Sequence, residues 1–282
     1  MQLSVFISGR GGSKKSKENN LKKEYRLRLT KNEHDLIKEQ RNASDEIILC
    51  ISDLHIPYHH QDSIKFLRAV KEHYNIEDNN PNHHIFNSGD EADFHGISMH
   101  DSETSLPTQH NETLKARKVF KELEALFPKM VLVHSNHGSM LYRRGKKHGI
   151  PNYMLRDYNE VLGVGDGWKW YPDYKFKMNN GQWLFMTHGM KKNGLALAKE
   201  MGMCVIQGHY HTTFEINYTS SPLSLSWNMA VGCLIDDHSL AFAYNKVNSA
   251  RVILGCGIII NGQPKLLPMV LEKGGRWNGL VN

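Results

Sequence analysis

Short apolar runs in this chain end, one after another, at polar residues of the kinds that bind metal ions. The runs are residues 47–51, 85–86, 130–133, 183–186 and 204–206. Continuous apolar runs of this length are typical of strands buried on both faces. Apolar residues at helical spacing separate several of the runs, over 61–74, over 109–126 and around Leu195. Strands that alternate with helices in this way predict a layered α/β fold.

The last third of the chain is rich in strand-like segments. Apolar runs occur at 225–235, 239–245 and 251–260. The dipeptide Asn261-Gly262 precedes further apolar residues over 266–271, and this pattern is a β-hairpin signal. Because 282 residues exceed the usual size of one domain, we expect a large domain over 46–282 that follows an appendage.

The appendage is a basic arm over residues 1–45. It holds 11 Lys and Arg against 6 Asp and Glu, whereas the formal charge of the whole chain is only +6. Gly, Ser and Lys residues over 8–20 predict a flexible segment, and the capping-box sequence of 30–33 predicts a short polar helix to about Asn42. Such an arm is either a solvated surface segment or a contact for nucleic acid or another chain.

Cysteine usage and hydropathy indicate where the protein works. The four cysteines lie far apart and form no C-x-x-C pair. This spacing excludes a disulfide framework and a zinc finger, so we expect reduced thiols and a cytoplasmic protein. No stretch approaches the roughly 18 apolar residues of a membrane span. The apolar stretch at the start of the chain is too short for a secretory signal. We therefore expect no membrane partner.

Polar clusters follow the first five apolar runs directly. They are Asp53-x-His55, Gly89-Asp90 with Asp93, Asn136-His137, His188-Gly189 and Gly208-His209-x-His211. Open α/β sheets bind ligands at the carboxyl ends of their strands, so these clusters are expected to meet. Each cluster alone is commonplace in turns. Together they favour a site for two divalent cations, which need mixed oxygen and imidazole ligands and a bridging carboxylate.

The ordered set resembles the motifs of the calcineurin-like metallophosphoesterase superfamily. The family pattern is D-x-H, G-D-x-x-D, G-N-H-[DE], a lone His before Gly, and G-H-x-H, and the resemblance covers residues 47 to about 215. It implies a sandwich of two mixed β-sheets flanked by helices. Residues 95–112 and 141–151 are similar to phage-encoded members, for which the location would be the host cytoplasm.

The resemblance also implies a role for individual residues. The metal ligands would be Asp53, His55 and His211 for one ion, Asn136, His188 and His209 for the other, and Asp90 as the catalytic bridge between them. His137 would contact the scissile phosphate and protonate the leaving oxygen. This ligand set suits Mn²⁺, our first expectation, and also Fe or Zn²⁺.

The third motif departs from the family pattern. It reads Ser135-Asn136-His137-Gly138, so Gly replaces the acidic residue that would orient the histidine. We expect Asp93 to take that role. The second motif also lacks the Asp-Arg-Gly continuation of the protein phosphatases, which makes protein dephosphorylation a less favoured activity.

Several further residues are candidate substrate contacts. The basic run of Arg143, Arg144, Lys146 and Lys147 is placed to meet additional phosphates, or else forms a solvated loop. The aromatic residues Trp168, Trp170, Tyr171 and Tyr174 are candidates for a base-stacking wall, although such clusters more often form core. Among the remaining histidines, we expect His100, His110 and His134 near the site or on the surface, and His59, His60, His83 and His84 in loops.

These observations favour a two-metal phosphodiesterase or nuclease that acts on nucleic acid or nucleotides through metal-activated hydroxide. The basic arm and the basic run suit a substrate with several phosphates. Two alternatives stay open: a nucleotide phosphomonoesterase that uses the same metals, and a non-catalytic nucleic-acid-binding or scaffold protein. An open basic channel would favour a polymer, and a closed pocket with an aromatic wall would favour a mononucleotide.

Overall fold

The computed structural model describes residues 45–98, 105–222, 224–236, 238–239 and 251–281. These residues belong to one compact unit that begins at Asp45. The expected basic arm with its helix, His100 and most of the strand predicted over 239–245 lie outside the described residues. In the part of the chain that is described, no helix combines the length and the apolarity that a membrane crossing needs.

The first sheet contains parallel strands in its centre and an antiparallel hairpin at one side. Its strands are β1 (Ile47–Ile51), β2 (His83–Asn87), β3 (Met130–Val133), β4 (Trp168–Tyr171), β10 (Gly255–Ile260) and β11 (Gln263–Pro268), in the order β11-β10-β1-β2-β3-β4. β1 to β4 pair in parallel, whereas β10 pairs antiparallel with both β1 and β11. The turn residues Asn261 and Gly262 both have positive φ, which a two-residue type I′ hairpin requires, so the predicted hairpin is confirmed.

The second sheet is also mixed. Its strands are β5 (Tyr174–Lys177), β6 (Trp183–Thr187), β7 (Cys204–Gln207), β8 (Phe214–Ser220) and β9 (Leu225–Val231), in the order β5-β6-β7-β9-β8. β6, β7 and β9 run parallel, and the edge strands β5 and β8 pair antiparallel with their neighbours.

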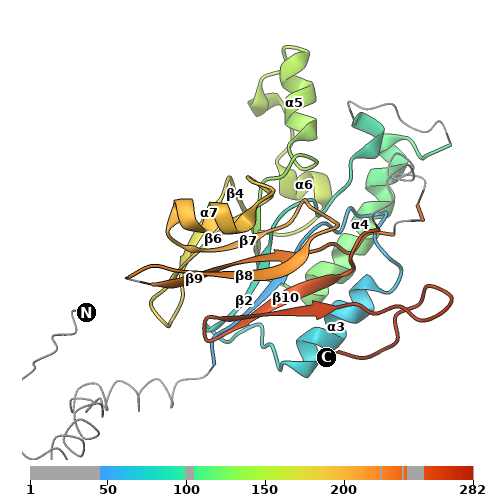
Figure 1. Ribbon diagram of the computed structural model, residues 1–282. Coiled ribbons are helices and arrows are strands. Elements are labelled where there is room, and N and C mark those ends of the chain that lie inside the picture. The colour runs from blue at the N-terminus through green and yellow to red at the C-terminus, as the bar shows by residue number, and fades with distance from the viewer. Residues whose placement is uncertain (1–44, 99–104, 223, 237, 240–250, 282) are drawn as a thin grey trace, which may run out of the picture. The chain divides into compact units, whose positions relative to one another are not determined.

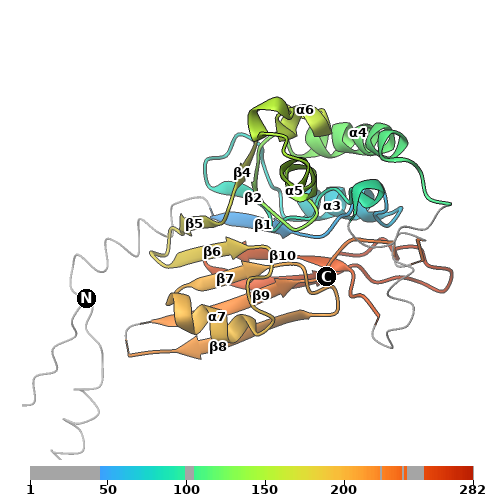
Figure 2. The ribbon, with the colours of Figure 1, turned by 90° about the horizontal axis from the view of Figure 1, so that it is seen from above.

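Helices cover the outer faces of both sheets (Figures 1 and 2). The helices are α3 (Ser63–His73), α4 (Gln109–Leu126), α5 (Met140–Lys147), α6 (Tyr158–Leu162) and α7 (Gly194–Met201), with 3₁₀ turns η1 (His95–Ile97) and η2 (Asn152–Met154). α3 and α4 lie on the first sheet, and α7 packs on the second through Leu197 and Ala198. The sandwich of two mixed sheets with flanking helices is the fold that the motif resemblance implies.

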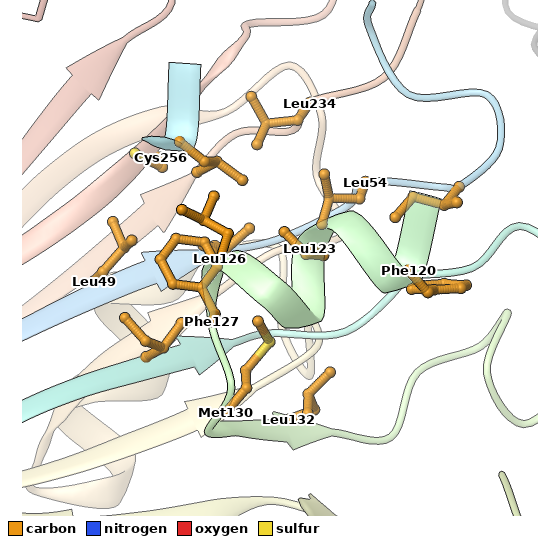
Figure 3. Close-up of a cluster of buried hydrophobic side chains, with 14 of the residues drawn as sticks. Leu49, Leu54, Phe120, Leu123, Leu126, Phe127, Met130, Leu132, Leu234 and Cys256 are labelled. Atoms are coloured by element: carbon orange, nitrogen blue, oxygen red, sulfur yellow. The ribbon is translucent and has the colours of Figure 1, made fainter. Parts of the chain in front are cut away.

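Strand β1 shows how the sequence builds these layers. All five of its residues are buried, and successive side chains of a strand point to opposite faces. Leu49 and Ile51 therefore join the core beneath the helices, in one buried cluster with Phe120, Leu123 and Phe127. Figure 3 shows Leu49 with Phe127 in this cluster. Ile48 and Cys50 point to the other face and pack against the second sheet. Because β1 packs against an apolar core on each of its faces, every position of the strand holds an apolar residue.

Several expectations need correction at this level. The basic run, for which a solvated loop was one of two alternatives, lies in helix α5. His83 and His84 begin strand β2 rather than lying in a loop. Trp168 is only 1% exposed and donates its indole N–H to the Phe127 carbonyl oxygen, so it belongs to the core and not to a substrate wall. All four cysteines are buried thiols, as expected.

Candidate metal centre

The loops after five strands meet at one place. They follow β1, β2, β3, β6 and β7, and they bring three overlapping groups of side chains within reach of a metal ion. The groups are Asp53 with His55 and His211, Asp90 with His188 and His209, and His55 with Asp90 and His137. In each group the ligand atoms all lie within 4.8 Å of one another. The parallel strands deliver the motifs to a common edge, as the fold class requires.

Unusual backbone conformations aim these side chains. Asp53, His55, Asp90 and His209 have φ angles of 51°, 48°, 51° and 69°. Left-handed backbone is costly for residues other than Gly and persists where the surrounding structure holds it. Here the His55 N–H donates to the Asp90 carbonyl oxygen (2.8 Å), and the Asp53 N–H donates to the Gly89 carbonyl oxygen (3.0 Å). The first two loops therefore fix each other.

The first group centres on the buried carboxylate of Asp53. Its Oδ1 lies 3.0 Å from Nε2 of His211 and 3.8 Å from Nε2 of His55. Its Oδ2 accepts hydrogen bonds from the His209 N–H (2.8 Å) and from the Ser52 hydroxyl. One oxygen thus holds the loop after β7, while the other lies among the imidazoles.

The second group centres on Asp90 and His188. Nε2 of His188 lies 2.9 Å from Oδ2 of Asp90 and 2.8 Å from Oδ1 of Asn136. Nδ1 of His188 donates to the Ser88 carbonyl oxygen (2.7 Å), which directs Nε2 toward the centre. The same Oδ2 of Asp90 is 3.5 Å from Nε2 of His55, so this oxygen lies between the two groups. Asp90 is therefore a member of two of the three groups, one with His188 and His209 and one with His55 and His137.

Asp93 organises two histidines at once. Its carboxylate accepts a hydrogen bond from Nδ1 of His55 (2.7 Å), and its main-chain carbonyl oxygen accepts one from Nδ1 of His137. Asp93 thus contacts His137 mainly through its main-chain carbonyl oxygen, while its carboxylate Oδ1 lies 3.6 Å from the same Nδ1. The rings of His55 and His137 lie edge to face with centroids 4.5 Å apart.

Charge balance within the cluster is reflected in its pKa values. Burial would raise the pKa of Asp53 and Asp90, but the hydrogen bonds and positive charges of His211 and His188 hold both values below the usual range. Burial would likewise lower the pKa of His188, yet Asp90 raises it to about 9. For His137 burial prevails and lowers the pKa. Divalent cations compete with protons for such donors, so the acidic and imidazole set fits them.

The basic run divides into residues with different roles. Arg143 donates to the main-chain carbonyl oxygen of Asn136 (2.5 Å), at the edge of the cluster. Arg144 instead donates to the carbonyl oxygens of Ile97 and Ser98, which ties α5 to η1. Lys146 and Lys147 are exposed. Arg144 is therefore engaged within the protein, and the other three cations face solvent or the centre.

Other candidate residues lie apart from the cluster or support it. His110 and His134 are exposed, whereas the buried His60 contacts the Gly275 carbonyl oxygen. The Trp170 indole N–H donates to Glu91, behind the loop that carries Asp90. Sequence reasoning missed the Ser88 carbonyl oxygen and the buried carboxyl of Glu112. Glu112 accepts from the N–H groups of His95 and Gly96, and the capping position of Thr108 before α4 is the only sequence signal near it.

Comparison with known proteins gives matches among solved structures. No family model and no curated protein matches the chain. Among solved structures, the chain is similar to Vps29 of Chaetomium thermophilum, with a TM-score of 0.43 and 11% identity over 84% of this chain and 96% of that chain. It is also similar to a conserved uncharacterized protein of Streptococcus pneumoniae described as a predicted phosphoesterase, with a TM-score of 0.32 and 11% identity over 85% and 97% of the two chains. The motifs and the geometry of the cluster are therefore the features that bear on function.

Proposed function

We propose that this protein is a two-metal phosphoesterase that hydrolyses phosphodiester bonds in nucleic acid or nucleotides. The observation that carries the proposal is the position of Asp90 Oδ2, 2.9 Å from His188 and 3.5 Å from His55, between two sets of ligand atoms. Asp53, His55 and His211 would hold one cation, and Asn136, His188 and His209 the other. Two bound cations, Mn²⁺ first among them, would polarise the phosphoryl oxygens and supply hydroxide at neutral pH.

His137 is the residue that would move a proton. Its Nδ1 is committed to the Asp93 carbonyl oxygen, which leaves Nε2 to hold the proton for the departing alkoxide. Burial lowers its pKa, and the negative charge of a bound phosphoester would raise that pKa again. Arg143, anchored beside Asn136, would face charge that develops on the substrate.

Metal binding and hydrolysis provide the first test. Purified protein, stripped of metal and titrated with Mn²⁺ in a calorimeter, should bind two ions and should then hydrolyse bis-para-nitrophenyl phosphate. Absence of both binding and hydrolysis would support the scaffold alternative. Faster hydrolysis of para-nitrophenyl phosphate and of mononucleotides than of diesters would support the phosphomonoesterase alternative.

The His137→Ala variant separates the proton donor from the ligands. It should bind Mn²⁺ with nearly the affinity of the original protein, because His137 lies outside the two proposed ligand sets. Its turnover should fall by about a hundredfold or more on an alkyl phosphodiester, which needs a proton on the leaving oxygen, and much less on bis-para-nitrophenyl phosphate. Equal losses on both substrates would contradict the assigned role.

A further inference from the structure

The segment around and after His137, residues 134–156, is strongly basic and contains no Asp or Glu. These residues contain five Lys and Arg. They include α5 and η2, which stand apart from the two sheets in Figure 1. This segment of one charge is unlike the remainder of 46–282, which holds 19 Lys and Arg against 23 Asp and Glu. Its charge points to an anionic partner.

The cations of α5 form a stripe that begins at the metal centre. Arg143, Lys146 and Lys147 are exposed and are spaced three and four residues apart, which places them on one face of the helix. Arg143 contacts the Asn136 carbonyl oxygen at the near end. Because a helix rises 1.5 Å per residue, Lys147 lies about 6 Å farther along the axis. A bound polyanion would leave the metals along this face.

An exposed aromatic residue lies in η2, the turn that follows α5. Tyr153 in η2 is 82% exposed and Met154 is 66% exposed. The turn is held against α5, since the Ile150 N–H donates to the Gly145 carbonyl oxygen (2.9 Å) and Leu155 fills the space above Gly145. Because the Tyr153 ring stays exposed, the domain forgoes the hydrophobic stabilisation that burial of the ring would give. An exposed aromatic ring on a turn that packs against a basic helix is the kind of surface on which bases of a single strand stack.

From these observations we infer that α5 and η2 form a docking surface for a single-stranded nucleic acid whose scissile phosphate lies at the metal centre. The inference rests on the proposed function for the position of the scissile bond. Phosphates would pair with Arg143, Lys146 and Lys147, and a base would stack on Tyr153. A mononucleotide would end at the metals and leave this surface empty. The basic arm of residues 1–45 has the same sign of charge and therefore does not complement the surface.

The test compares a polymer with a small diester in matched variants. The test variants are Lys146→Ala with Lys147→Ala, and Tyr153→Ala. The controls are Lys118→Ala with Lys121→Ala on the exposed face of α4, and Tyr218→Ala, a half-exposed tyrosine on β8. The readout is the ratio of kcat/KM for a thymidine 20-mer to kcat/KM for bis-para-nitrophenyl phosphate, both with Mn²⁺. In the test variants the ratio should fall by about tenfold, and in the controls it should stay within twofold.

Salt dependence and binding without turnover complete the experiment. For the double lysine variant, the slope of log kcat/KM against log salt on the 20-mer should weaken by about 1.4, since each single-strand phosphate contact contributes about 0.7. An unchanged ratio and slope in an active protein would overturn the inference while leaving the proposed function intact. If the protein hydrolyses neither substrate, the proposed function fails. Anisotropy of a labelled 20-mer in EDTA then decides the docking surface alone: weaker binding by the test variants supports it, and equal binding by all variants overturns it.

Discussion

At the scale of single residues, the most unusual group outside the metal centre is Glu112. Its carboxyl is 2% exposed and accepts hydrogen bonds from two N–H groups of η1, at His95 and Gly96 (both 3.1 Å). Burial, reinforced by the negative charge of Asp93, raises its pKa to about 7. The folded protein therefore binds a proton that the unfolded chain releases near the ordinary value of 4.5.

This raised pKa predicts a pH-dependent stability. Because the pKa of Glu112 is higher in the folded state, the free energy of unfolding should fall as the pH rises from about 4.5 through 7, by about 3 kcal/mol in total. Glu112→Gln should remove this part of the pH dependence. Because the amide offers one acceptor oxygen to the two N–H groups, the readout is the change with pH and not the absolute stability. Urea unfolding at pH 5 and pH 8 measures the effect, with the exposed Glu122→Gln as control. If Glu112→Gln keeps the full difference between the two pH values, the assignment is wrong.

At the scale of elements, the sequence predicts those strands that are buried on both faces. β1, β3, β6 and β7 appear as apolar runs because each of them faces two layers. β4, β5 and β8 lie at sheet edges, and their more buried and more exposed residues largely alternate. Their exposed polar residues interrupt the apolar pattern, so the sequence does not indicate these strands clearly. Helix α5 is also hard to predict from the sequence, because only Met140 and Gly145 in it are buried. Its attachment depends on Arg144, whose partners lie 46 and 47 residues earlier in the sequence.

The attachment of α5 gives a prediction about local stability. Arg144→Ala removes the hydrogen bonds from the guanidinium to the carbonyl oxygens of Ile97 and Ser98, each worth about 1.5–3 kcal/mol because the donor is charged. Hydrogen exchange at the Ile97 and Ser98 amides, which the turn protects, should then accelerate by tenfold or more. Lys147→Ala, on the exposed face of the same helix, should leave that exchange unchanged. Unaltered exchange in Arg144→Ala would show that other contacts hold η1.

The candidate site itself was predictable in its residue types and not in its supporting contacts. The donor side chains can be identified from the sequence because each lies in a short motif and the motifs follow one another in a fixed order. The hydrogen bonds that aim them join residues far apart, such as His55 with Asp93, 38 positions on, and His188 with Ser88, 100 positions back. A carbonyl oxygen carries no side-chain signal, so the contacts of Ser88 and Asp93 with the two histidines appear only when the chain is folded.

At the scale of the whole molecule, one contact fastens the C-terminal segment to the domain. The carboxylate of Asp62, just before α3, accepts two hydrogen bonds from Arg276 (2.6 and 2.7 Å) and one from the Trp277 N–H (3.0 Å). The Trp277 ring packs edge to face on Phe66 of α3. The contact with Arg276 holds the pKa of Asp62 well below its usual range.

Loss of this contact should destabilise the folded protein. Asp62→Ala should reduce the free energy of unfolding by about 2–4 kcal/mol at pH 7, because it leaves the Trp277 N–H and the guanidinium without their acceptor. The stabilisation by Asp62 is present above the ordinary carboxyl pKa near 4 and is lost as the pH falls toward the lower folded value, so the two proteins should converge in acid. Urea titrations at pH 7 and pH 3 test this. A difference that is as large at pH 3 as at pH 7 would contradict it.

The position of β10 beside β1 has a consequence for how the protein matures on the ribosome. Ile47 of β1 pairs with Ile260 of β10, and the Leu234 N–H donates to the Asp53 carbonyl oxygen. The strand that leads into the loop of Asp53 and His55 thus keeps one edge open until the chain as far as Ile260 has left the exit tunnel. Open edges invite pairing with other chains. Nascent chains should therefore depend on protection of this strand edge during translation.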